Sequence, residues 1–204
     1  MFIIFIFALT HILSTLSARE VSVLPFVGSH HIVMHKATPF VNDSIVVSTC
    51  KIYVTSIHDI NAHVTLLNLD QGNVFVISDS TESLQFGIDS NQTIHTSFSD
   101  ALDPLHGMFW TWNSGYIHCK IEGHIIRAQN QRRAFQLHLG GYTSPYATIY
   151  RMNIPKGNQR LTISIDIKPC LEKLIQENTY EIMLPGKKAK EMADLFYSSM
   201  SITN

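Results

Sequence analysis

The sequence predicts an all-β fold: a single β-sandwich domain with a short C-terminal helical segment. Apolar and polar residues alternate in at least six separate segments, which is the pattern of half-buried strands. A helical pattern appears only near the end of the chain, where Ala189, Met192, Ala193 and Phe196 fall at positions i, i+3, i+4 and i+7. Many short strands with helices confined to the end are typical of a β-sandwich.

Residues 1–18 have the pattern of a signal peptide. An apolar run over residues 2–9 precedes small residues over 14–18, so we expect cleavage near Ala18. The run is too short to span a bilayer, and no other stretch does so. We therefore expect an exported protein, periplasmic or secreted, with no transmembrane span in the mature chain; an uncleaved anchor is the less favoured alternative. Residues 19–204 are enough for one domain.

The predicted elements follow in order along the chain. Residues 20–40 have strand-like composition, and further strands are expected over 44–57, 63–69, 73–78, 84–88, 108–113, 115–122, 135–139 and 161–167. The turn signature Asp70-Gln-Gly-Asn73 separates two of these strands. Residues 123–133 are expected to form an exposed connection. A short helix is predicted over 171–177, after Pro169, and a second helix after Gly186.

The charge argues against one class of partner, and the cysteine content limits the number of disulfides. The formal charge is −1 and there is no basic cluster, so nucleic acid is not expected as a partner. The three cysteines, Cys50, Cys119 and Cys170, allow at most one disulfide and show no Cys-x-x-Cys spacing. Alternation with Ile117 and Ile121 favours Cys119 as a buried small hydrophobe, whereas a Cys50–Cys170 bridge stays open.

The stretch from residue 103 to 142 holds unusual chemistry. It contains both tryptophans and four of the eleven histidines: His106, His118, His124 and His138. In an extended strand Met108, Trp110 and Trp112 would share one face. Imidazole and thioether groups suit a transition metal, but aromatic side chains mostly pack in cores. From the residues alone, an aromatic core with incidental histidines is therefore the favoured interpretation, with a metal site as the alternative.

Three motifs in this stretch lead further. They are Leu-Asp-Pro-x-x-Gly-Met-Phe-Trp-Thr-Trp-Asn-Ser-Gly-Tyr-Ile at 102–117, Lys-x-Glu-Gly-His at 120–124 and Phe-x-x-His-Leu-Gly-Gly-Tyr at 135–142. Together they resemble the MbnP-like family of copper-binding periplasmic proteins. The resemblance extends to residues 44–57, 85–90 and 183–194, and so covers most of the mature chain.

The resemblance implies copper bound by histidines, with a nearby tryptophan oxidised to kynurenine. It places Trp110 or Trp112 at that position. The metal ligands we expect are His138 together with His124, and His106 as a further candidate. His138 belongs to the polar row of its strand, and a strand holds a ligand rigidly.

Two histidines of this stretch depart from the family pattern. His106 stands where the family more often has a polar amide, and His118 where it has an apolar residue. We expect His118 to be solvated. Glu122 or Asp103 is the expected carboxylate that orients a ligand ring.

The predicted function is that of an exported copper-binding protein that captures or carries the ion. It is not expected to be an enzyme, and no Ser/His/Asp or Cys/His arrangement can be assigned. The alternative is a non-catalytic β-sandwich interaction module that binds a carbohydrate or a protein through its aromatic patch. A redox enzyme using bound copper is a weaker third hypothesis. The sequence does not identify a protein partner.

Overall fold

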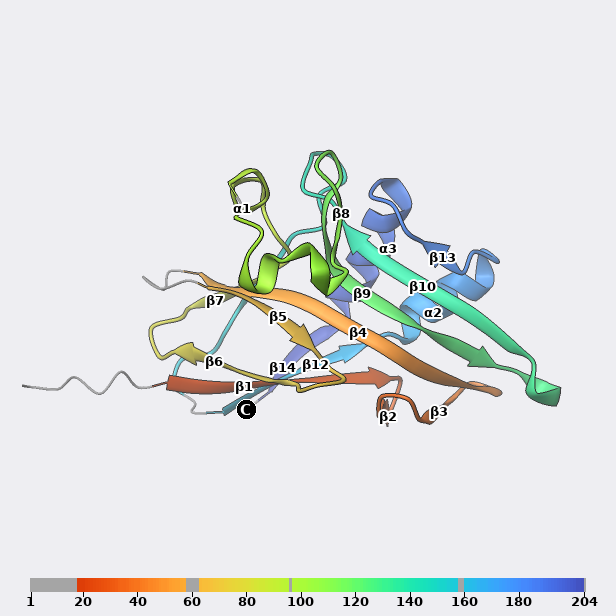
Figure 1. Ribbon diagram of the computed structural model, residues 1–204. Helices are drawn as coiled ribbons and strands as arrows, with labels where there is room; N and C mark the ends of the chain where they lie inside the picture. The colour runs from red at the N-terminus through yellow and green to blue at the C-terminus, as the bar shows by residue number, and fades with distance from the viewer. Residues whose placement is uncertain (1–17, 58–62, 96, 158–159, 204) are drawn as a thin grey trace, which may run out of the picture.

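The structure is a computed structural model that describes residues 18–57, 63–95, 97–157 and 160–203. The predicted signal peptide lies outside the described residues except for Ala18, which begins the first strand. The fold is mostly β, as the sequence predicts, and consists of two sheets with a few helices (Figure 1). None of the helices in the described ranges is long and apolar enough to cross a membrane.

The smaller sheet forms one layer of the fold. Its strand order is β14-β12-β1-β2, with β6 also paired to β1. The central pair, β1 and β12, is parallel and joins Glu20 to Arg160 and Phe26 to Asp166. The strands in the described residues are β1 (Ala18–Val27), β2 (His30–His31), β6 (Val74–Ser78), β12 (Arg160–Asp166) and β14 (Met200–Thr203).

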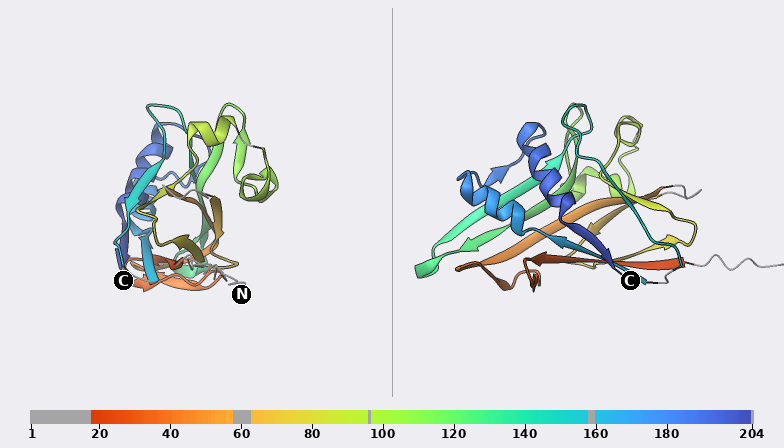
Figure 2. Two further views of the ribbon diagram at one scale, coloured as in Figure 1. Left: turned by 90° about the vertical axis from the view of Figure 1, so that its left-hand side faces the viewer. Right: turned by 180° about the vertical axis from the view of Figure 1, so that it is seen from behind.

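The larger sheet is curled and contains most of the strands of the described chain (Figure 2). Its main order is β11-β7-β4-β9-β10-β13, while β3 and β5 pair with β4 and β8 pairs with β9. The strands are β3 (Ala37–Phe40), β4 (Asp43–Ile57), β5 (Val64–Asn68), β7 (Ser83–Phe86), β8 (Phe109–Thr111), β9 (Gly115–Ile126), β10 (Arg132–Gly140), β11 (Tyr150–Asn153) and β13 (Glu181–Ile182).

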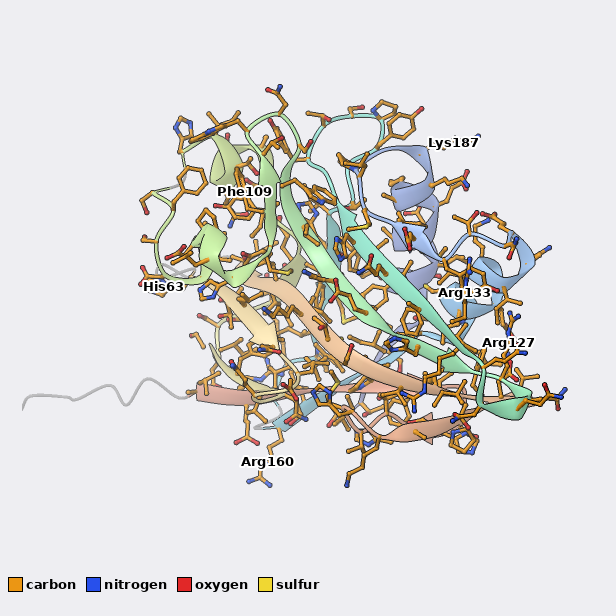
Figure 3. All side chains as sticks on the ribbon, turned by 45° about the vertical axis from the view of Figure 1, so that its right-hand side comes forward. His63, Phe109, Arg127, Arg133, Arg160 and Lys187 are labelled. Atoms are coloured by element: carbon orange, nitrogen blue, oxygen red, sulfur yellow. The ribbon has the colours of Figure 1, made fainter. Side chains whose placement is uncertain are left out.

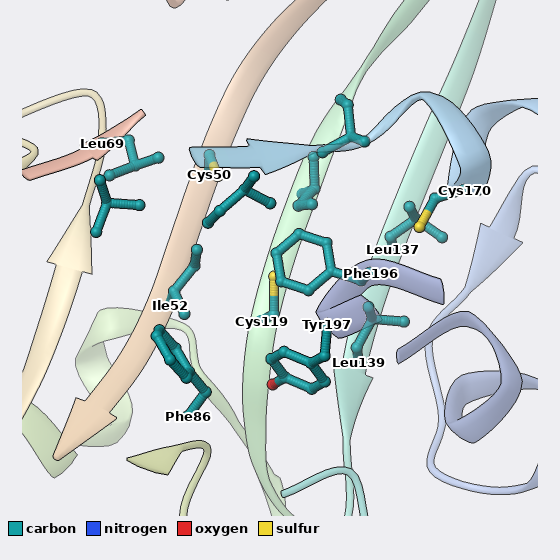
Figure 4. Close-up of a cluster of buried hydrophobic side chains, with 14 of the residues drawn as sticks. Cys50, Ile52, Leu69, Phe86, Cys119, Leu137, Leu139, Cys170, Phe196 and Tyr197 are labelled. Carbon is teal, nitrogen blue, oxygen red and sulfur yellow. The ribbon is translucent and has the colours of Figure 1, made fainter. Parts of the chain in front are cut away.

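Helices complete the layer that faces the larger sheet. In the predicted β-sandwich, this layer would consist of strands alone. Helices α2 (Lys168–Gln176) and α3 (Lys187–Ser198) lie across β9 and β10 when the molecule is seen from behind (Figure 2). Helix α3 begins after Gly186, as predicted, whereas α2 begins at Lys168, three residues before the predicted start, and includes Pro169 in its first turn. The predicted stripe of α3 is buried, and Phe196 packs with Cys119 and Leu139 in the core (Figure 4).

The remaining helices are short and lie in the connections. They are α1 (Ser90–Ile94) and the 3₁₀ helices η1 (Asp100–Leu102), η2 (Pro104–His106) and η3 (Ala128–Asn130). Asp89 caps α1 through its side chain and Gln92 reaches back to the Asp89 backbone, which is a complete capping box.

One predicted connection is different in the structure. Residues 123–133 are not all connection: β9 continues to Ile126 and β10 begins at Arg132. The turn signature at Asp70 to Asn73 separates β5 from β6, as predicted. The two strands belong to different sheets, because β5 pairs with β4 and β6 with β1, and local sequence does not identify these distant partners.

The buried thiols are all free. Cys50, Cys119 and Cys170 lie in the core and none forms a disulfide. Burial raises the pKa of Cys50 and of Cys170 to about 12, so both thiols stay protonated. The structure confirms the prediction that Cys119 is a buried small hydrophobe.

The core predicts a sharp contrast between two leucines. Leu139 on β10 is 0% exposed and Leu105 on η2 is 92% exposed. We expect Leu139→Ala to lower the free energy of unfolding by about 2–5 kcal/mol, because it leaves a cavity among closely packed side chains. Leu105→Ala, the matched control, should change it by less than about 0.5 kcal/mol. Urea denaturation measures both; equal losses would contradict this core.

Candidate functional site

A capping segment, residues 97–114, covers the outer face of the larger sheet. Under it lies a second small core, separate from the main one, with partly buried Phe109 and Trp110 at its margin. The fully buried members of this second core are Tyr53, Ile88, Met108, Tyr116 and Ile117. The aromatic stretch is therefore partly core, as the interpretation of an aromatic core predicted, but this core lies on the outer face of the sheet.

Four side chains of the sheet hold the capping segment by its backbone. They are two tyrosines and two lysines from β4 and β9, and each donates a hydrogen bond to a carbonyl oxygen. The bonds run from Tyr53 to Ala101 (2.9 Å), from Tyr116 to Leu102 (2.9 Å), from Lys51 to His106 (2.8 Å) and from Lys120 to Gly107 (3.4 Å). The position of the segment is thus determined by side chains at fixed places in the strand register.

The predicted single row of Met108, Trp110 and Trp112 is wrong. Strand β8 has only three residues, and its pairing with β9 is irregular between Phe109 and Thr111. Met108 is fully buried, whereas Trp112 is 68% exposed. The Trp112 ring instead contacts Phe98 edge-on, with ring centroids 4.7 Å apart. One irregularity in the pairing is enough to separate the side chains.

Trp110 lies against a glycine of β10. A Cβ atom at Gly140 would come within 2.8 Å of Trp110 Cζ3 and within 2.4 Å of the Tyr116 carbonyl oxygen. Any side chain at this position would push the indole away. The absence of a side chain at Gly140 thus makes room for the ring.

His138 occupies the same outer face, two residues before Gly140. It lies opposite Lys120 in the register and is almost completely buried, although it projects away from Leu137 and Leu139. Its Nε2 is 2.8 Å from Glu122 Oε1, and Lys120 Nζ is 3.5 Å from the same oxygen. The predicted orientation of a ring by Glu122 is therefore present at His138.

Burial and the charges of Glu122 and Lys120 determine the protonation state of the His138 imidazole. Burial lowers the His138 pKa and outweighs the opposing hydrogen bond with Glu122, while Lys120 lowers it further. Partial burial alone would raise the Glu122 pKa, but His138 and Lys120 hold it below its ordinary value. At pH 7 the imidazole is neutral and the carboxylate is ionised. Since a carboxylate only accepts, Nε2 carries the proton and the lone pair lies on Nδ1.

The other two predicted ligands lie apart from this group. His124 is exposed and pairs with Ala134, four residues along β10 from His138, or roughly 13 Å at the rise of a strand. His106 is exposed on η2, where its Nε2 donates to the Asp100 carbonyl at 2.8 Å. Among the described residues, no three His, Cys, Asp or Glu side chains gather into a metal-binding cluster.

His118 is buried, which corrects the expectation that it is solvated. The ladder between β9 and β10 pairs Cys119 with Leu139 and Ile117 with Gly140, so His118 falls in the irregularity between them. Its ring lies against Gly87, and Nδ1 is 2.9 Å from the Thr148 hydroxyl. A Cβ at Gly87 would come within 2.7 Å of Nδ1, so only glycine leaves room for the ring.

Sequence reasoning missed four residues that shape this region: Lys51, Tyr53, Gly87 and Thr148. Lys51 and Tyr53 were visible as members of a strand, but their bonds to the capping segment depend on its path. Thr148 lies 30 residues from His118 in the chain. The structure supplies the missing register, in which Lys51, Lys120 and His138 are successive partners across three strands.

The buried His118 predicts acid sensitivity. Burial lowers its pKa to about 4, against the opposing effect of the Thr148 and Ile88 carbonyls. In the unfolded chain this histidine takes up a proton near pH 6.5, whereas in the folded protein it does so only near pH 4. The free energy of unfolding is therefore unaffected by His118 above pH 6.5 and decreases as the pH falls towards 4. The decrease is about 3 kcal/mol.

His118→Gln should show a smaller loss of unfolding free energy between pH 7 and 4, because the other titrating groups are common to both proteins. Urea denaturation at a series of pH values measures the difference. Titration of the His118 ring near pH 6.5 by NMR would contradict the prediction.

Comparisons with known proteins agree with this architecture. The MbnP family model matches residues 19–184 of the chain. Among solved structures, MbnP from Methylosinus trichosporium superimposes with a TM-score of 0.52 at 12% sequence identity, over 76% of this chain and 77% of that chain. At this identity the superposition shows a shared fold only. The search of curated proteins found no match. Because the family model spans most of the sequence, the chain belongs to the MbnP family.

Proposed function

We propose that the protein is an exported copper-binding protein that captures or carries the ion without catalytic turnover. Copper is here a cargo, and the outer face of β9 and β10 is where it binds. Family membership supports the class of function, and the arrangement around His138 supports the place. The predicted signal peptide supports export to the periplasm or the exterior.

The observation that carries the proposal is the state of His138. Its imidazole is neutral, is held by Glu122 through Nε2, and makes no hydrogen bond through Nδ1 to any described residue. A carboxylate on one ring nitrogen with a lone pair on the other is the arrangement that orients histidine ligands of metals. A neutral imidazole binds copper without first losing a proton.

Trp110 is the tryptophan best placed beside this ligand. It rests on Gly140, two residues along the strand from His138, whereas Trp112 is turned towards solvent and Phe98. We therefore propose Trp110, ahead of Trp112, as the residue whose oxidation would add an aromatic amine to the site.

His124 and His106 complete the proposed ligand set. His106 Nδ1 is the more accessible of its ring nitrogens, because Nε2 is bonded to the Asp100 carbonyl. His106 is also held close to the strand row that ends at His138, since its own carbonyl accepts from Lys51. His124 is farther along β9, so its participation requires the ligand set to change on metal binding.

A copper titration tests the ligands one at a time. His138→Ala should weaken copper binding at least tenfold, because it removes the oriented donor. His30→Ala is the matched control, since His30 is an exposed histidine of β2 in the other sheet. Affinity should be retained at pH 7 and should fall only in acid below the ordinary range of histidine, because burial lowers the pKa of His138 and protons compete for its ring only there.

Two further measurements separate the parts of the proposal. His124→Ala and His106→Ala identify which histidine joins His138, and the mass of native, metal-loaded protein shows whether a tryptophan is oxidised. If neither His138→Ala nor His124→Ala weakens binding, the proposed site is wrong. Protein isolated from its native compartment without copper would favour the alternative of an interaction module.

A further inference from the structure

Three segments that lie at one end of the molecule contain no charged side chains. Asp, Glu, Lys and Arg are absent from residues 90–99, 104–119 and 134–150, although the chain contains 15 Lys and Arg and 16 Asp and Glu. Three loops of these segments project together: α1, the β8–β9 turn and the connection after β10 (Figures 1 and 2). By contrast, Arg127 and Arg133 lie at the opposite end of the β9–β10 hairpin (Figure 3).

The three loops are packed against one another. A Cβ at Gly115, the first residue of β9 after the β8–β9 turn, would lie 2.7 Å from the Tyr142 ring and 3.3 Å from Thr93 Cγ2 of α1. Gly115 has φ +73°, a conformation that favours glycine. The loops therefore form one surface with a fixed arrangement.

Each loop carries a large apolar side chain that is turned to solvent. Ile94 of α1 is 63% exposed, Trp112 of the turn is 68% exposed and Tyr146 of the third loop is 43% exposed. Trp112 and Tyr146 are the aromatic members of the exposed large hydrophobic residues in the described chain. Trp112 is held in place by edge-on contacts with Phe98 and Phe109. Its exposure is thus a fixed feature of the surface.

We propose that these three tips insert into the interface of a lipid bilayer. Tryptophan and tyrosine favour the boundary between headgroups and acyl chains, and isoleucine favours the apolar side of it. Loop tips without charged side chains can enter this layer without removing their own ions from water. The tips lie on separate projecting loops, so a soft, uncharged layer can accept all three at once, whereas a rigid protein partner would need a matching pocket for each.

Phosphatidylcholine vesicles test the proposal with the purified protein. We expect the protein to sediment with the vesicles, and its tryptophan emission to shift to shorter wavelength when the vesicles are added. Trp112→Ser and Ile94→Ser should each weaken partitioning about tenfold, the effect of withdrawing one large apolar side chain. Binding should be insensitive to salt, because no ion pair contributes. Any effect of the N-terminal apolar run is common to all variants.

Val76→Ser is the matched control, because Val76 is 67% exposed but lies on β6 of the smaller sheet. It should leave partitioning unchanged. Absence of partitioning at millimolar lipid, or an equal loss in Val76→Ser, would overturn the proposal. An emission shift with a neutral oligosaccharide but not with vesicles would assign the surface to a glycan. Copper titration of the same variants reports separately on the metal site.

Discussion

The outer face of the larger sheet depends on how the capping segment is held. Tyrosine and lysine side chains of β4 and β9 donate hydrogen bonds to the carbonyl oxygens of that segment. Backbone carbonyls are present in every residue, so this attachment leaves the side chains of the segment free for other contacts. Met108 turns inward, Trp110 rests on β10 and Trp112 faces solvent as a result. Loss of a lysine or tyrosine donor would affect all three.

The sequence predicted which segments form strands and helices better than it predicted their neighbours. Alternation found β4 and β10, and the helical stripe found α3 together with the residues it buries. Alternation could not reveal that β1 pairs with β12, because the paired residues, such as Glu20 and Arg160, lie far apart in the chain. Alternation also assumes regular pairing, and it failed for Trp112 and His118, where the ladders are irregular.

The same limit applies to the candidate site. The polar face of β10 followed from local pattern and is present in the structure. Of the two carboxylates expected to orient a ring, Glu122 and Asp103, Glu122 is hydrogen-bonded to His138. Which histidines converge depends on the register of three strands and the path of a loop, and neither is written in local sequence. The structure therefore divides the predicted ligands: His138 is hydrogen-bonded to Glu122, whereas His106 and His124 lie apart from this pair. Their role as ligands stays a prediction.

The alternation of side chains across β9 also keeps two kinds of chemistry apart. Cys119 points into the core, while its neighbour Lys120 points to the face that holds His138. Thiolate sulfur is among the strongest ligands for copper and is readily oxidised beside it. One layer of backbone thus separates the outer face, where we propose that copper binds, from the three sulfhydryl groups within. Copper bound there would reach no thiol of its own carrier, and transfer to another molecule would not compete with capture by these sulfur atoms.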